Sequence, residues 1–166
     1  MNACQHFAGA RPTRLYCRGD ESNTYGTVNR LYGLIEYENG CVAVVESSKR
    51  TTLTQELQVA CAQATLALPV AWTIYEDALL IERGDLPWPH PTTTNHTVAA
   101  ADSYQLQLEN FADVIEGSAP PLVPLAQSDL NTYTLEALLA SAAAGRPIDV
   151  EVPPEIVRAL PSASTA

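Results

Sequence analysis

Residues 30–48, RLYGLIEYENGCVAVVESS, contain two apolar runs on either side of the dipeptide Asn39-Gly40. This dipeptide favours a two-residue hairpin turn, because such a turn requires positive φ at both central positions. One face of the first run carries Leu31, Gly33, Ile35 and Tyr37, and the other carries Tyr32, Leu34 and Glu36. Both faces are largely apolar, so the segment predicts an antiparallel hairpin with both sides covered.

Further alternating runs lie before and after this hairpin. Residues 11–18 place Leu15 and Cys17 on one side, and similar runs occupy residues 52–60, 63–70 and 77–85. We expect five or six strands, mostly antiparallel because their connections are too short for crossover helices. Residues 84–100 are rich in proline and threonine without periodicity and predict a long irregular connection.

Two helices are expected in the second half of the chain. In the first, over about residues 102–116, the apolar positions Tyr104, Leu108, Phe111 and Ile115 recur at helical spacing before Gly117. In the second, over about residues 129–144, Ser128 can cap the start and Gly145 the end. A short strand follows in residues 146–152. The chain is therefore expected to be one α+β domain over residues 1–160, an open, mostly antiparallel sheet with helices packed on one face, followed by a disordered tail over 161–166.

Charge and composition exclude several classes of partner. The formal net charge is -10, with one lysine, Lys49, so nucleic acid and anionic membrane surfaces would be repelled. No apolar run is long enough to span a bilayer and the N-terminus lacks a signal pattern, so a cytoplasmic protein is expected. Four scattered cysteines without a C-x-x-C pair argue against a zinc site or redox motif, and buried free thiols are expected.

The closing segment, residues 104–149, resembles the last helices of the substrate domain of the Gfo/Idh/MocA oxidoreductases. The matching positions are Tyr104, Phe111, Gly117, Asp129, Ala137, Ser141 and Gly145. The strands of residues 32–48 and the segment HFAGARPTRLYC, residues 6–17, are similar to the family's sheet and to the connection that leads into it. The resemblance covers nearly the whole chain and consists of packing positions.

The resemblance also implies what the chain should lack. Family members bind a dinucleotide through a Gly-x-Gly-x-x-Gly turn, which this sequence does not contain. The family's catalytic aspartate corresponds to Asn2, whose amide cannot act as a base, and His6 follows the expected histidine position. We therefore expect no cofactor bound by this chain alone, and NAD(P) only through a cofactor-domain partner in trans. The sequence alone does not decide whether the chain is an enzyme.

Candidate ligand contacts are weaker than the fold signals. By family analogy, Ser48, Lys49, Arg50 and Thr51 could hydrogen-bond a small polar ligand such as a sugar, although a solvated turn whose two cations offset the acidic surface is the favoured explanation. Trp88 could stack on a sugar face, and His90 could act as acid or base. We expect no metal site.

The leading hypothesis is a free-standing substrate-binding and oligomerisation domain, dimeric through its uncovered sheet face. One alternative is a cofactor-independent lyase or isomerase that uses Lys49, His90 or Tyr104. Another is a truncated oxidoreductase.

Overall fold

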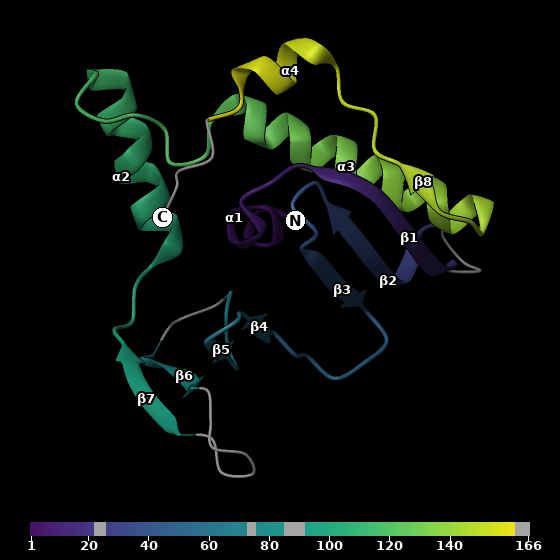
Figure 1. Ribbon diagram of the computed structural model, residues 1–166. Coiled ribbons are helices and arrows are strands. Elements are labelled where there is room, and N and C mark those ends of the chain that lie inside the picture. Colours follow the sequence, from purple (N-terminus) through teal and green to yellow (C-terminus); the bar gives the residue numbers. More distant parts are fainter. Residues whose placement is uncertain (22–25, 73–75, 85–91, 162–166) are drawn as a thin grey trace. The chain divides into compact units, whose positions relative to one another are not determined.

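The computed structural model describes residues 1–21, 26–72, 76–84 and 92–161 (Figure 1). The chain divides into two compact units, unit 1 with Met1–Thr51 and Val123–Ala166, and unit 2 with Thr52–Leu122. The single domain predicted over residues 1–160 stays a prediction. The predicted tail lies almost wholly outside the described residues.

Unit 1 is built on a four-stranded antiparallel sheet. Its strand order is β3 (Val42–Ser48), β2 (Val28–Tyr37), β1 (Pro12–Glu21) and β8 (Ile148–Asp149). Leu15 pairs with Ile35 and Cys17 with Gly33 in the β1–β2 register, which places these four residues on one face. All four are buried, as the alternation predicts.

The predicted hairpin is confirmed, but its turn is longer than two residues. The Gly40 amide donates to the Tyr37 carbonyl at 2.9 Å, and the Tyr37 amide donates to the Cys41 carbonyl at 2.9 Å. Gly40 takes the left-handed conformation with a φ of 81°. A three-residue hairpin loop usually ends in one left-handed residue, and here that residue is Gly40.

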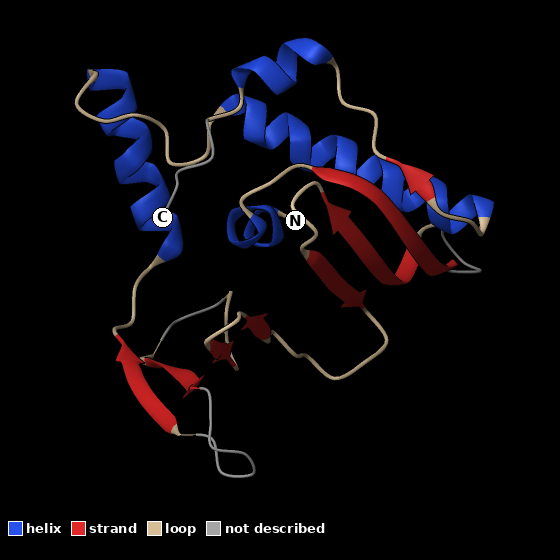
Figure 2. Ribbon diagram, viewed as in Figure 1, coloured by secondary structure: helices blue, strands red, loops and turns tan. Residues whose placement is uncertain are grey.

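The described residues of unit 1 form three helices: α1 (Asn2–Ala8), α3 (Leu125–Ala144) and α4 (Pro154–Ala159). The long helix α3 packs along β1 (Figures 1 and 2). The core contains Leu15, Cys17, Ile35, Tyr37 and Leu138, with Ala8 of α1. A β-carbon on Gly33 would lie 2.8 Å from Cδ2 of Leu138, so the absent side chain lets α3 approach the sheet.

The second predicted helix begins four residues earlier than expected. α3 starts after Pro124, and Ser128 lies inside its first turns, so the predicted Ser128 cap is wrong. The buried positions are Ala126, Leu130, Thr134, Leu138 and Ser141. Because Thr134 and Ser141 on this buried face are polar, the sequence pattern did not show which face of the helix packs against the sheet. Gly145 closes the helix in the left-handed conformation as predicted, and α4 was not predicted.

Unit 2 contains a second antiparallel sheet of strands β4 (Leu57–Ala60), β5 (Ala64–Leu68), β6 (Ala78–Gly84) and β7 (Thr93–Val98), in that order. The prediction of an irregular connection over residues 84–100 is wrong for β7. Its polar residues pair with β6 as an exposed edge strand. Helix α2 (Ser103–Glu116) follows, capped by the Asp102 carboxylate and closed by left-handed Gly117.

The predicted α+β class with antiparallel strands is confirmed. The strands are divided between two four-stranded sheets, where the sequence suggested a single one.

Candidate functional site

The predicted contact turn, Ser48–Thr51, follows β3 in unit 1. The Ser48 hydroxyl accepts from the Arg50 amide at 3.0 Å, and the Lys49 amide donates to the Asn29 carbonyl at 2.9 Å. These bonds fix the backbone, whereas the Lys49 and Arg50 side chains are exposed and pair with no carboxylate in the described part of the chain. The turn therefore presents two cationic donors that can bind hydroxyl or carboxylate oxygens.

Trp88 and His90, the other predicted contacts, lie outside the described residues. For the lyase alternative, Lys49 belongs to unit 1 and Tyr104 to unit 2, and both side chains are exposed. The alternative stays a prediction. His96 on β7 bonds the Glu82 carboxylate at 2.9 Å, and both side chains are largely exposed.

Helix α1, which carries Asn2 and His6, is held against α3 by a network of amides. The Gln5 side chain is 4% exposed, donates to the Thr134 hydroxyl at 3.1 Å and accepts from the Gln127 amide. Asn131 donates to the Asn2 side chain at 3.4 Å. His6 is exposed and packs edge-on against Phe7. The amides of Asn2, Gln5, Gln127 and Asn131 can accept and donate hydrogen bonds, but an amide cannot act as a general base.

Sequence reasoning missed this amide network. A glutamine on a short helix reads as a surface residue, and nothing local marks Thr134 as its partner 129 residues later. The only signal is indirect: Gln5 and Ala8 are spaced three apart, as residues on one helix face are.

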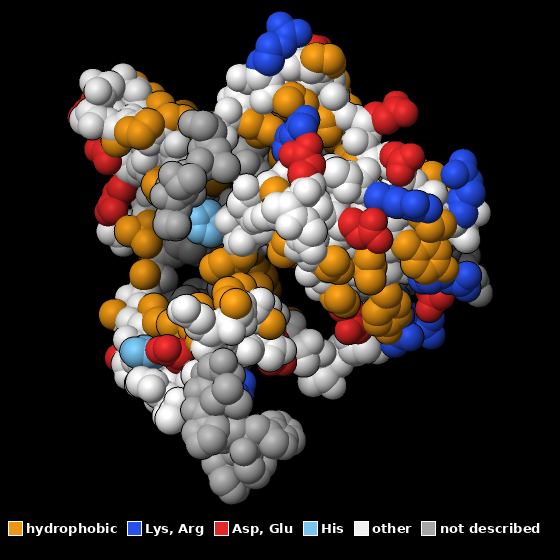
Figure 3. Space-filling view, in the orientation of Figure 1, with side chains coloured by type: hydrophobic (Ala, Val, Ile, Leu, Met, Phe, Trp, Pro, Cys, Tyr) orange, Lys and Arg blue, Asp and Glu red, His pale blue; other side chains and the backbone are white. Residues whose placement is uncertain are grey.

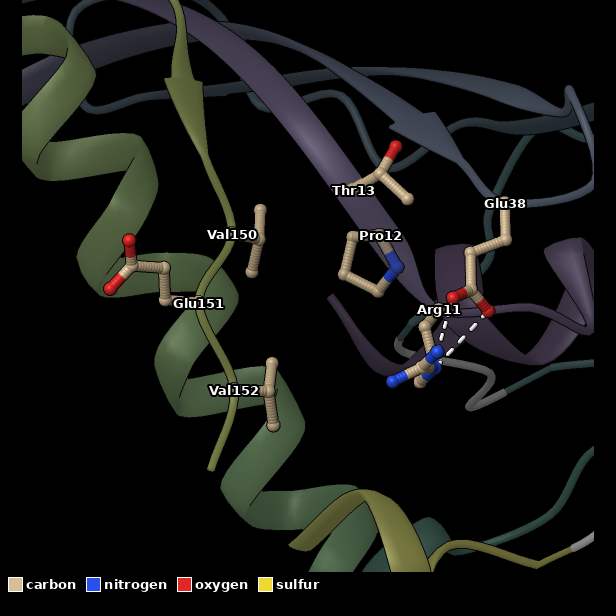
Figure 4. Close-up of a pocket in the computed structure, with 7 residues that line it drawn as sticks. All are labelled: Arg11, Pro12, Thr13, Glu38, Val150, Glu151 and Val152. Atoms are coloured by element: carbon tan, nitrogen blue, oxygen red, sulfur yellow. Dashed lines mark hydrogen bonds and ion pairs between the residues drawn. The ribbon is translucent and has the colours of Figure 1, made fainter. Parts of the chain in front are cut away.

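A cavity of about 370 Å³ lies where the chain after β8 separates from the start of β1. Val150 and Val152 point into it toward Pro12, Glu151 points away, and Arg11 is paired with Glu38 through two hydrogen bonds (Figure 4). Pro12, Val150 and Val152 line the cavity together with this ion pair, Thr13 and Glu151. The Thr13 hydroxyl donates to the Glu36 carbonyl at 3.2 Å, so this lining does not pair a nucleophile with a base.

The cysteines are all free, as expected, but their burial differs from the prediction. Only Cys17 is buried, Cys4 is half-buried, and Cys41 and Cys61 are exposed. Across the described ranges, no group of three or more His, Cys, Asp or Glu side chains could hold a metal ion. Nor does any described helix have the length and apolarity needed to cross a membrane.

The sequence is similar to part of a known protein. No protein-family model matches the sequence. The chain is 27% identical over 152 residues to D-xylose 1-dehydrogenase (NADP(+)) 2 of Haloferax volcanii, covering 91% of this chain and 45% of that protein. The chain thus spans about half the length of this curated relative.

Solved structures agree with this match. A protein of Desulfitobacterium hafniense described as an NADPH-dependent oxidoreductase superposes with a TM-score of 0.77 at 18% identity, covering 90% of this chain and 45% of the other. An aldose-aldose oxidoreductase of Caulobacter crescentus gives 0.74 at 15% identity, with 89% and 44% covered. The chain resembles the C-terminal half of Gfo/Idh/MocA-type oxidoreductases.

The positions that carried the Gfo/Idh/MocA resemblance have identifiable structural roles. Gly117 and Gly145 both end helices in the left-handed conformation. Ser141 is fully buried and hydrogen-bonded, whereas Tyr104 and Phe111 lie exposed on α2. The shared pattern therefore includes helix ends and α3–sheet packing, and identifies no catalytic group.

Proposed function

We propose that this chain is the substrate-binding and oligomerisation half of an NAD(P)-dependent sugar oxidoreductase, working with a dinucleotide-binding domain on a partner. The observation that carries the proposal is the match of 91% of the chain to 45% of a D-xylose dehydrogenase. The superposition on the C. crescentus aldose-aldose oxidoreductase supports the same fold. The sequence contains no glycine-rich dinucleotide turn, which is why we assign NAD(P) to the partner.

Within this function, the turn Ser48–Thr51 contacts the sugar. Its backbone is fixed by the Ser48 hydroxyl, and its two cations are available as donors to hydroxyl oxygens. Trp88 supplies a stacking face and His90 a further hydrogen-bonding group. Since the amide of Asn2 cannot remove a proton, we assign the chemical step to the partner.

We also propose a homodimer formed through the outer face of the unit 1 sheet. This outer face carries the aligned row Tyr16, Leu34 and Val44, whose side chains are 37%, 40% and 81% exposed. Arginines and carboxylates lie in the other rows of this face: Arg14 and Glu36 beside Val42, Arg18 and Glu46 beside Tyr32, and Asp20 beside Arg30. Figure 3 shows hydrophobic side chains beside both basic and acidic ones on unit 1. A two-fold interface can bury the apolar row and match opposite charges.

The free cysteines fit a reducing compartment, so we infer that the protein works in the cytoplasm.

Nuclear magnetic resonance of the 15N-labelled chain tests the sugar-binding assignment. Titration with D-xylose should shift the amide signals of Lys49 and Arg50, and the double variant Lys49→Ala/Arg50→Ala should lose the response. The matched control Arg146→Ala/Arg158→Ala removes two exposed cations elsewhere in unit 1 and should retain it. Shifts confined to other residues would reject this turn as the site. No shift with D-xylose, other sugars or cyclitols would reject sugar binding.

A further inference from the structure

Two free cysteines of unit 1 lie near one buried tyrosine. Cys41 is opposite Tyr37 in the β2–β3 hairpin, joined to it by the amide-to-carbonyl bond of 2.9 Å. Opposed residues of an antiparallel pair carry their side chains on the same face. Cys4, on α1, packs against the core cluster that contains Tyr37. Cys4 therefore lies against the core cluster of Tyr37, and the exposed Cys41 lies at the end of the hairpin on the same sheet face as Tyr37.

A hydrogen bond attaches helix α1 to this hairpin close in sequence to both cysteines. The Asn39 side-chain amide donates to the Ala8 carbonyl at 2.8 Å, and its oxygen accepts from the Cys41 amide at 3.1 Å. Cys4 lies one helical turn before Ala8 and so faces the same side of α1. α1 also packs against β3.

The environment of the tyrosine supports this closeness. Burial raises the pKa of the Tyr37 phenol, and the negative charges of the Cys4 and Cys41 thiolates raise it further.

We propose that Cys4 and Cys41 form a reversible disulfide that ties α1 to the β2–β3 turn. Cys41 is exposed and Cys4 half-buried, whereas Cys17 is buried and Cys61 belongs to unit 2. This modification site is independent of the proposed sugar oxidoreductase function.

The oxidant is a low-molecular-weight disulfide such as glutathione disulfide. The Cys41 thiolate attacks one of its sulfur atoms, which breaks the S–S bond, forms a mixed disulfide and releases one thiolate that takes up a proton. The Cys4 thiolate then attacks the Cys41 sulfur and releases the second thiol. Two protein thiols are oxidised, and one small disulfide is reduced to two thiols.

Peptide mapping of the full chain after incubation with glutathione disulfide tests the proposal. Trypsin places the four cysteines on four different peptides, residues 1–14, 15–18, 31–49 and 51–83, because cleavage after Arg11 is blocked by Pro12. Mass spectrometry without reduction should find peptide 1–14 linked to 31–49. The Cys61→Ser variant should keep this link, and the Cys41→Ser variant should lose it. Glutathione adducts on both cysteines without a link, a link to 51–83, or no reaction would overturn the proposal.

Thermal unfolding gives a second readout that needs no variant. Closing the loop between Cys4 and Cys41 restricts the unfolded chain, so the oxidised protein should melt on the order of 5–10 °C higher. Dithiothreitol should reverse the shift. If the linked protein had an unchanged or lower Tm, the disulfide would not be compatible with the native position of α1.

Discussion

The Ser141 hydroxyl accepts a hydrogen bond from the Cys17 amide at 2.9 Å and donates one to the Arg146 carbonyl at 2.7 Å. Ser141 and Cys17 are each 0% exposed. One hydroxyl therefore joins the end of α3 to the middle of β1 and satisfies two backbone groups that secondary structure leaves unpaired there. This gives a physical reason for a serine at a position where the family pattern also has one.

Replacing Ser141 by alanine should destabilise the protein by about 1–3 kcal/mol, because the buried Cys17 amide loses its partner. Urea unfolding followed by circular dichroism measures the change. Ser128→Ala on the same helix is the control. Since Ser128 is exposed and does not cap α3, its loss should cost under about 0.5 kcal/mol. Equal costs for the two serines would contradict the assigned roles.

Gly33→Ala should destabilise unit 1 by about 1–3 kcal/mol through overpacking. The new β-carbon would lie 2.8 Å from Cδ2 of Leu138 and 2.9 Å from Cγ2 of Val45. Val45→Ala removes one of these clashes, so the double variant should lose less stability than the two single variants added together. Additive losses in urea unfolding would show that the clash with Val45 is not a cause of the lost stability.

Val44→Asp should convert the proposed dimer to a monomer, because it places a charge in the apolar row of the outer sheet face. Sedimentation equilibrium measures the molecular mass. Leu53→Asp is a matched control, since Leu53 is also 81% exposed but lies outside both sheets. A monomeric wild-type protein, or a dimer unaffected by Val44→Asp, would reject this interface.

The free energy of unfolding should fall as the pH rises above about 9 to 10. Burial raises the pKa of the Cys17 thiol and of the Tyr37 phenol above their ordinary values of 9.0 and 10.0. Their contribution is therefore fully present below those values. It is lost as the pH rises, by up to about 1.4 kcal/mol per pH unit for each group, because the unfolded chain releases these protons first.

Tyr37→Phe should reduce this alkaline slope in urea unfolding series at different pH values. The Tyr37 hydroxyl has no hydrogen-bond partner among the described residues, so the variant should be at least as stable at pH 7. Tyr32→Phe, on the exposed face, should leave the slope unchanged. An unaltered slope in Tyr37→Phe would contradict ionisation of this phenol as a cause.

Local sequence signals predicted the elements that depend on local chemistry. The alternation around Asn39-Gly40 identified β2 and β3, and Gly117 and Gly145 marked the helix ends correctly. The alternation did not identify the buried face, because both faces are largely apolar. β7 was missed because its residues, TTNHTV, are polar and nearly all exposed, so nothing distinguishes an edge strand from a loop. The start of α3 was misplaced because Ser128 has a side chain suited to capping, whereas the helix begins after Pro124 without a side-chain cap.

The candidate site was less predictable than the fold. Lys49 and Arg50 were predicted by family analogy, and the structure adds only the bonds that fix their backbone. The Gln5 network and the cavity beside Pro12 are formed by segments far apart in the sequence. No local pattern therefore predicts them.

A thermal-shift screen of the purified chain against NAD(H), NADP(H), sugars, sugar acids and cyclitols tests the proposed function most directly, because a ligand that binds only the native state raises its apparent stability. We predict that a sugar or cyclitol raises Tm, by an amount equivalent to about 2.7 kcal/mol at a hundred times its Kd, and that a nicotinamide cofactor alone does not. A rise in Tm with NAD(H) or NADP(H) alone would contradict the assignment of the cofactor to a partner. An unchanged Tm with every carbohydrate would contradict the assignment of the substrate to this chain.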